Sequence, residues 1–182
     1  MSLKNFLEVV EIRTKVASFF PFLIGVLYSL AHFNEFHGFY TVLFFIGMLT
    51  FDMTTTAINN YMDFKKAHSD TYKYEQNVIG RERISPALVR KMILIMLGIS
   101  AIIGLLLSMM TGWLFLIMGG MVCLVGIFYT FGPIPVSRMP LGELASGLTM
   151  GLGLFAMTVY LNTVNQRVFY LDISFKNNSF SL

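Results

Sequence analysis

The sequence predicts an all-α membrane protein, a bundle of about five transmembrane helices in a single domain covering residues 1–182. Of these residues 55% are hydrophobic and only 13% are charged, whereas a soluble domain is about a quarter charged. The apolar residues come in long blocks rather than in the alternation of a strand or the stripe of an amphipathic helix. The basic residues cluster between particular blocks, which indicates a membrane topology.

Five apolar blocks are long enough to cross a bilayer. About 20 helical residues, each rising about 1.5 Å, span a hydrocarbon core of about 30 Å. Helices are required because lipid offers no partner for unpaired backbone groups. The first block follows a mixed-charge segment and is expected to remain as an anchor rather than to be cleaved as a signal peptide. The predicted spans are 16–33, 39–61, 92–110, 113–131 and 141–161.

The basic residues also predict the orientation of the bundle. All 13 Lys and Arg except Arg167 and Lys176 lie before the first span, between the second and third, or between the fourth and fifth. The positive-inside rule places that side in the cytoplasm. We therefore expect an integral membrane protein with its N-terminus and its polar loops in the cytoplasm. The net charge of +3 is modest, and nothing in the sequence points to nucleic acid as a partner.

The second span ends in a strongly polar segment, NNYMDFKKAHSD, at residues 59–70. Positions three and four apart share a helix face, so Asn59 or Asn60 would project together with Asp63, and Lys66 would follow one turn later. Such oxygen ligands beside a cation suit Mg²⁺ that shares its coordination with substrate phosphates. A zinc site is not indicated, because the segment has one histidine and no cysteine. The alternative is an ordinary polar helix end whose lysines supply the positive-inside charge.

A second polar feature is predicted on the same membrane face. The segment FYTFGPIPVSRMPLGELASG, residues 128–147, places Tyr129, Arg138 and Glu143 around two turns stiffened by proline. Each of the two features is weakly specific alone. Together, on one face of the membrane, they favour a binding site.

Charged residues within or beside the first two spans leave alternatives open. Asp52 lies in the second span, where a carboxylate at the helix centre costs about 2.5 to 3.5 kcal/mol on insertion scales, so it should face the bundle interior. It could belong to the site or make a buried structural hydrogen bond. Arg13 and Lys15, at the start of the first span, could be interfacial anchors or could reach the same anionic ligand.

These segments resemble the UbiA superfamily of intramembrane aromatic prenyltransferases, in the branch that acts on 1,4-dihydroxy-2-naphthoate in menaquinone synthesis. INNYMDFKKAHSD is similar to the family's first aspartate-rich motif, NDxxDxxxD. YTFGPIPVSRMPLGE is similar to its YxxGPxPxxxxxLGE loop, and IRTKVASFFPFLIG to its first span. The resemblance covers residues 10–165.

The resemblance implies site residues in three roles. The catalytic residues that it implies are Asp63, Lys66 and Arg138. The substrate-binding residues are Arg13, Asn60 and Tyr129. The Mg²⁺ ligands are Asn59, Asp63 and Asp70. Asn60 stands where the family usually has aspartate, and Asp70 follows Asp63 by seven residues rather than four.

The reaction that the resemblance implies is Mg²⁺-assisted loss of diphosphate from an allylic polyprenyl diphosphate, with attack by an electron-rich ring carbon on the resulting cationic C1. A water-poor chamber would protect that cation from hydrolysis. Three alternatives remain: another aromatic acceptor, a transporter with Asp52 as its ion site, and a catalytically incomplete or vestigial membrane fragment.

Family members have about nine helices and a second aspartate-rich motif in a later cytoplasmic loop. The chain resembles the N-terminal half of that fold, and its last residues, NQRVFYLDISFKNNSFSL, carry no such motif. We therefore expect a truncated copy, or a chain completed by a second polypeptide or by a missing C-terminal half.

Overall fold

A computed structural model describes residues 1–131, 144 and 147–164; of residues 127–131 it describes the backbone alone. Within these residues the chain is helical and has no strand, as the sequence predicted. The elements in chain order are α1 (Leu3–Val9), the 3-10 helix η1 (Ile12–Lys15), α2 (Val16–Tyr28), the π-helix η2 (Ser29–Phe33), α3 (Gly38–Lys66), the π-helix η3 (Tyr72–Gln76), α4 (Val78–Arg81), α5 (Pro86–Thr111), α6 (Trp113–Phe131), the π-helix η5 (Gly147–Gly153) and α8 (Leu154–Asn162).

Three helical segments are long and apolar enough to span a membrane: Ile12–Phe33, Gly38–Lys66 and Pro86–Thr111. They contain the first three predicted spans and extend beyond them. Hydrophobicity marks only the part of a helix that lies in lipid, whereas the backbone hydrogen bonds of the helix continue into water. Shorter apolar helices, Trp113–Gly126 and Gly147–Asn162, lie in the fourth and fifth predicted spans. The fifth span was predicted to begin at residue 141, which lies outside the described residues.

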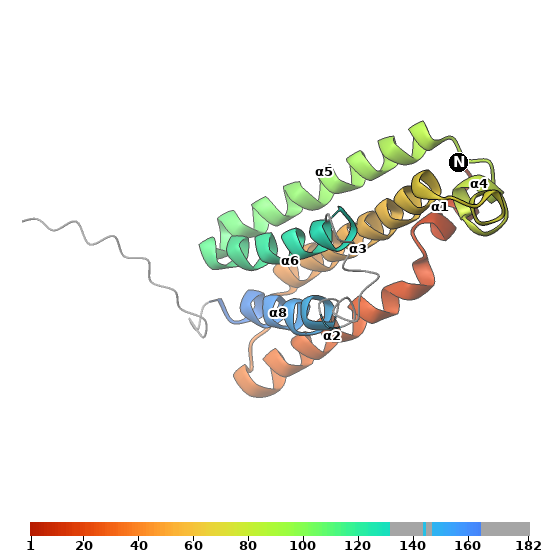
Figure 1. Ribbon diagram of the computed structural model, residues 1–182. Helices are drawn as coiled ribbons and strands as arrows, with labels where there is room; N and C mark the ends of the chain where they lie inside the picture. The colour runs from red at the N-terminus through yellow and green to blue at the C-terminus, as the bar shows by residue number, and fades with distance from the viewer. Residues whose placement is uncertain (132–143, 145–146, 165–182) are drawn as a thin grey trace, which may run out of the picture.

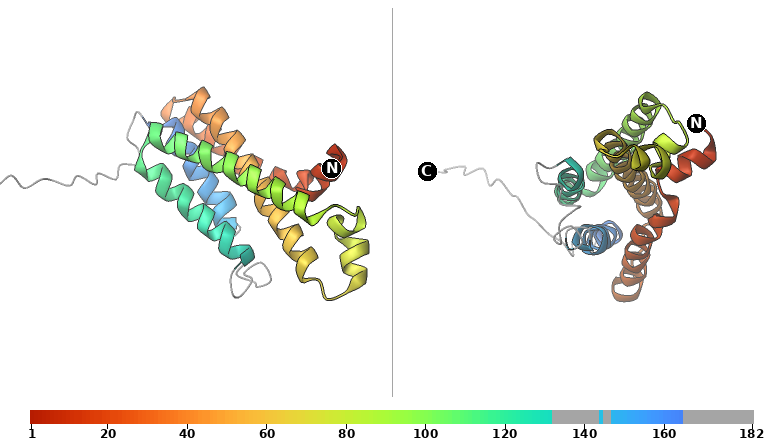
Figure 2. Two further views of the ribbon diagram at one scale, coloured as in Figure 1. Left: turned by 90° about the horizontal axis from the view of Figure 1, so that it is seen from above. Right: turned by 45° about the vertical axis from the view of Figure 1, so that its right-hand side comes forward.

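The helices pack mainly in two pairs (Figures 1 and 2). α3 makes its most extensive contact with α5, and α2 packs on α8. Glycine permits both approaches: a Cβ added at Gly47 would lie 2.7 Å from Ile103 Cγ2, and one at Gly25 would lie 2.7 Å from Thr158 Cβ. Small residues of this kind let helix backbones come close where lipid provides little hydrophobic drive.

Two apolar clusters hold the bundle together. One lies among α2, α3, α5, α6 and α8 and includes Phe22, Phe44, Leu107, Phe115 and Tyr160. The other lies near one end, where α1 and α4 cover α3 and α5, and includes Val9, Val10, Ala57, Ile79 and Val89. The outer face of α5 carries large exposed apolar side chains, among them Leu94, Ile102 and Met109. Such a surface suits contact with lipid tails.

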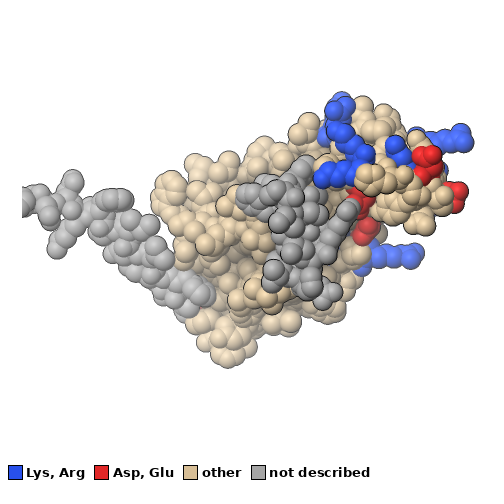
Figure 3. Space-filling model, in the orientation of Figure 1, with Lys and Arg blue, Asp and Glu red and all other residues tan. Residues whose placement is uncertain are grey.

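Charged side chains gather at one end of the bundle, around α1 and α4, while the other described residues on the face in Figure 3 are uncharged. There Arg81 of α4 pairs with Glu8 of α1 and with Glu82. The hydrogen bond to Glu8, followed by that to Glu82, raises the pKa of the Arg81 guanidinium. These contacts join the N-terminal helix to the connection between α3 and α5 and give the bundle one polar cap.

Candidate active site

A half-open cavity of about 710 Å³ lies in the bundle, bordered by η1, α2, α3, α5, α6, η5 and α8. Its lining is mostly apolar and includes Phe44, Met48, Phe51, Leu107, Phe115 and Leu154. Polar side chains on its wall include Glu11, Thr14, Lys15, Asp52, Thr56 and Asn59. These six come from η1, its preceding turn and the C-terminal half of α3, so the cavity has one polar side. A cavity of this kind can hold a largely apolar ligand that carries one polar end.

One face of α3 carries the polar groups toward the charged end of the bundle. Asp52, Thr56, Asn59 and Asp63 follow one another at spacings of four, three and four residues, so they lie along one stripe of the helix. The stripe is about 16 Å long, because each helical residue rises about 1.5 Å. Asp52, Thr56 and Asn59 border the cavity, and Asp63 lies one turn beyond, half-buried. The predicted pairing of Asn59 with Asp63 on one face is therefore compatible with the structure.

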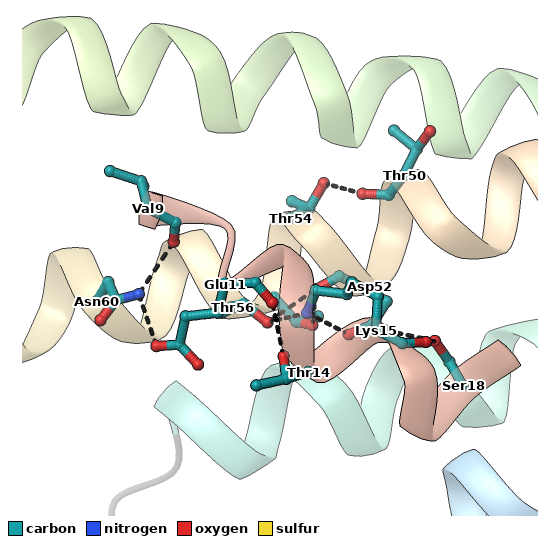
Figure 4. Close-up of polar contacts among 11 residues, drawn as sticks. Val9, Glu11, Thr14, Lys15, Ser18, Thr50, Asp52, Thr54, Thr56 and Asn60 are labelled. Carbon is teal, nitrogen blue, oxygen red and sulfur yellow. Dashed lines mark hydrogen bonds and ion pairs between the residues drawn. The ribbon is translucent and has the colours of Figure 1, made fainter. Parts of the chain in front are cut away.

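A buried ion pair joins the start of the first span to this stripe (Figure 4). Lys15 Nζ donates to Asp52 Oδ1 at 2.8 Å and to Thr56 Oγ1 at 2.5 Å. Asp52 Oδ2 accepts a hydrogen bond from Ser18 Oγ at 2.6 Å. Lys15 and Asp52 are only 5% and 6% exposed. Lys15 is thus a buried partner of Asp52 rather than an interfacial anchor, and Asp52 faces the interior as expected.

Asn60 fixes the turn that brings Lys15 to α3. Its Nδ2 donates to the Val9 carbonyl at 2.9 Å and to Glu11 Oε1 at 3.0 Å. Glu11 has a φ of 49°, in the left-handed region, which is unfavourable for a residue with a side chain and needs support from its surroundings. In this structure the Asn60 amide holds the turn between α1 and η1, and Asn60 does not belong to the cavity lining; its role in substrate binding stays a prediction.

The structure separates several of the other predicted site residues from the cavity wall. Arg13, in η1, is exposed and does not border the cavity. Lys66 is exposed at the last residue of α3, and the backbone becomes extended at Ala67, so Asp70 does not continue the polar stripe. The side chain of Tyr129, although α6 reaches Phe131, lies outside the described part of the chain, as does Arg138.

The donor set at the polar end fits Mg²⁺ as part of a metal–diphosphate complex. Asn59 and Asp63 offer two oxygen-bearing side chains one turn apart, and Mg²⁺ commonly binds through one or two carboxylates plus substrate phosphates and water. Among residues 1–131, 144 and 147–164, no group of three or more His, Cys, Asp or Glu is placed to hold a metal. Substrate oxygens would therefore complete the coordination.

Sequence reasoning left the pairing of Lys15 with Asp52 undetected. The sequence predicted Lys15 as a candidate interfacial anchor and Asp52 as a costly charge within the second span. Their opposite charges in adjacent membrane segments could have predicted the ion pair. Each charge alone has an unfavourable free energy in lipid, and pairing reduces it.

The fold and the cavity define an all-α membrane protein with an apolar chamber that is polar at one end. Comparison with known proteins identifies its relatives: the chain belongs to the UbiA prenyltransferase family, whose family model matches residues 18–174. Over 157 residues it is 28% identical to a 1,4-dihydroxy-2-naphthoate octaprenyltransferase of Bacillus subtilis (strain 168), a match that covers 83% of this chain and 49% of the relative. The chain thus spans about half the length of that relative. No solved structure matches the chain.

Proposed function

We propose that the protein takes part in transferring a polyprenyl group from a polyprenyl diphosphate to 1,4-dihydroxy-2-naphthoate. One observation carries the proposal: a single face of α3 leads from an apolar cavity, past Asp52 and Asn59, to Asp63 at the charged end. Membership of the UbiA family supports prenyl transfer in a membrane. The name of the Bacillus subtilis relative supports the choice of acceptor.

The polar end of the cavity is proposed to bind the diphosphate. Asn59 and Asp63 would hold Mg²⁺, which when bound supplies positive charge to the diphosphate oxygens. Lys66, one turn beyond on the same helix, would add a further positive charge toward the leaving group, and Arg138 is proposed to do the same. Asp70, Arg13 and Tyr129 remain candidates for this end from the sequence resemblance.

The apolar part of the cavity is proposed to receive the first isoprene units of the donor. Phe44, Met48, Phe51 and Phe115 border it, and the three phenylalanines offer no heteroatom nucleophile to a cationic carbon. Aromatic faces can also stabilise positive charge by cation–π attraction. Excluding water here would direct the carbon toward the ring of the acceptor rather than toward hydrolysis.

The proposed setting is a bacterial plasma membrane with the charged end of the bundle in the cytoplasm. The gathering of Lys and Arg at the end that carries α1 and α4 supports this orientation under the positive-inside rule (Figure 3). Diphosphate and acceptor would then both approach the cavity from the cytoplasmic side.

The test begins with binding, because the activity of the whole relative need not belong to a chain half its length. The chain in nanodiscs is expected to bind a radiolabelled polyprenyl diphosphate in the presence of Mg²⁺ and to lose most of that binding with EDTA. Asp63→Asn should abolish the Mg²⁺-dependent part, whereas the matched control Glu75→Gln, an exposed acid in η3, should retain it. Equal binding by the parent and Asp63→Asn would overturn the assignment. Prenylation of 1,4-dihydroxy-2-naphthoate is then measured as a separate assay of turnover.

A further inference from the structure

The ion pair of Lys15 and Asp52 lies on the cavity wall, where a ligand can reach it. A buried ion pair is weak evidence for a stabilising role, because desolvation of both charges offsets their attraction and an apolar pair of similar volume is often as stable. A charged side chain within a membrane-spanning helix is costly and usually marks a functional site. The position on the cavity wall therefore indicates that the pair serves a ligand.

Asp52 retains hydrogen-bonding capacity, and Lys15 has one long contact that a ligand could replace. Each carboxylate oxygen of Asp52 has one side-chain partner in the described structure, Lys15 for Oδ1 and Ser18 for Oδ2, and a carboxylate offers about four acceptor positions. The third contact of Lys15 Nζ, to the Asp52 backbone carbonyl, is its longest at 3.3 Å. That carbonyl also accepts from the hydroxyls of Thr55 and Thr56 at 3.0 and 3.1 Å. A ligand oxygen can replace the carbonyl as a partner of Lys15 with little loss of free energy, because the carbonyl keeps its two threonine donors.

The charge of the pair selects the chemistry of the ligand group. Lys15 and Asp52 together are neutral, so the pair gives a ligand carboxylate or a ligand cation no net attraction to offset the loss of hydration of its charge in surroundings of low dielectric constant. A hydroxyl adds no charge. It can donate to the Asp52 carboxylate and accept from Lys15 Nζ at the same time. Because the rest of the cavity is apolar, the hydroxyl should belong to an apolar skeleton such as an aromatic ring.

The geometry points to Lys15 and Asp52 as the site that binds a ring hydroxyl of the aromatic acceptor (Figure 4). The identity of the ligand as an acceptor rests on the proposed function. Asp52 precedes Asn59 by two helical turns, about 10 Å along α3. A ring held at Asp52 thus lies inside the cavity, beside the carbon chain of a donor whose diphosphate is held at Asn59 and Asp63. Donating to a carboxylate increases electron density on the hydroxyl oxygen, and that makes the ring carbons more nucleophilic.

The test measures preference for a hydroxyl in small aromatic probes. The parent chain in nanodiscs is dialysed to equilibrium against 1-naphthol, naphthalene or 2-naphthoate, and binding to empty nanodiscs is subtracted. The parent is expected to bind 1-naphthol roughly ten- to hundredfold more tightly than naphthalene, as fits a hydrogen bond to charged groups. It should bind 2-naphthoate no more tightly than naphthalene.

Three variants separate ligand binding from a purely structural role. The preference for 1-naphthol should be lost in Asp52→Asn. It should also be lost in the double variant Lys15→Met with Asp52→Leu, called the apolar pair. The apolar pair should keep the melting temperature of the parent. The matched control is Asn162→Leu, which removes a fully buried polar residue outside the cavity lining. It should lower the melting temperature and keep the preference.

Two results would overturn the inference: a parent without preference for 1-naphthol, or an apolar pair that keeps it. The proposed function is tested independently by the polyprenyl diphosphate assay. An Asp52-dependent preference in a chain that does not bind polyprenyl diphosphate supports a hydroxyl site and refutes the transferase proposal. Diphosphate binding through Asp63 without the preference refutes the hydroxyl site alone.

Discussion

Asn162 of α8 accepts a hydrogen bond from Thr41 of α3 through its Oδ1, at 3.0 Å across 121 residues of sequence. The same oxygen accepts from the backbone N–H of His37 at 2.9 Å, and Nδ2 donates to the Thr158 carbonyl at 2.9 Å. Asn162 is fully buried. It therefore holds the start of α3 against α8, at the end of the bundle opposite the charged cap.

Replacing Asn162 with leucine is expected to destabilise the bundle by about 1 to 3 kcal/mol, because the part-buried His37 N–H and the buried Thr41 hydroxyl would lose their shared acceptor. Unfolding in SDS–detergent mixtures, followed by circular dichroism, measures this loss. Thr50→Val is the control, since the Thr50 hydroxyl donates only to the Ile46 carbonyl of its own helix. An equal stability loss in both variants would contradict a special role for Asn162.

Restoring the family's usual aspartate at residue 60 should weaken the protein rather than improve it. Both partners of the Asn60 amide, the Val9 carbonyl and Glu11 Oε1, are acceptors, and an ionised aspartate has nothing to donate. Asn60→Asp is expected to cost about 1 kcal/mol of stability.

Adding Glu11→Gln to Asn60→Asp should recover part of that loss, because glutamine supplies a donor and removes a negative charge. Thermal unfolding of the parent, the single variant and the double variant gives the comparison. A single variant as stable as the parent would show that these contacts contribute little.

Replacing only Lys15 of the Lys15–Asp52 ion pair should lower the stability of the protein far more than replacing both residues. Lys15→Met leaves the Asp52 carboxylate buried without its cation, which typically costs about 3 to 5 kcal/mol. Adding Asp52→Leu removes the stranded charge and should return the stability to about that of the parent. The double-mutant cycle in SDS unfolding tests this. Additive losses in the double variant would mean that the two charges do not compensate each other.

Filling the cavity from α6 should reduce donor binding without unfolding the bundle. Gly120 borders the cavity, and an added Cβ would meet no atom within 4 Å. Gly120→Leu is expected to lower polyprenyl diphosphate binding about tenfold, the loss of roughly 1.4 kcal/mol. Equilibrium binding in nanodiscs provides the measurement.

The control for Gly120→Leu is Gly98→Leu on α5. A Cβ at Gly98 also enters open space, but Gly98 is exposed and does not border the cavity. This variant should bind the donor like the parent. If both leucine variants bound equally well, the cavity would not be the place of the polyprenyl chain.

Much of the fold could be predicted because lipid imposes simple requirements on a sequence. The apolar lengths of the first three spans predicted three membrane-length helices, and the stripe from Asn59 to Asp63 followed from helical periodicity alone. The continuation of α3 to Lys66 could not be read from hydrophobicity, because helix ends in water are fixed by local backbone contacts. The roles of Lys15 and Asn60 were also out of reach, since each depends on a partner at least 37 residues away along the chain.

The stripe on α3 fixes the spacing between the polar groups of the proposed site. Asp52, Asn59 and Asp63 belong to one continuous helix of 29 residues, so the distance between the proposed hydroxyl-binding and diphosphate-binding groups is set by backbone hydrogen bonds within that helix. Sliding or tilting of neighbouring helices would leave the spacing of Asp52, Asn59 and Asp63 unchanged, and only Lys15, on η1, would move relative to them. Substitutions in α2, α5 or α6 would therefore change how well ligands fit, while the separation of the two reacting partners along α3 would stay constant.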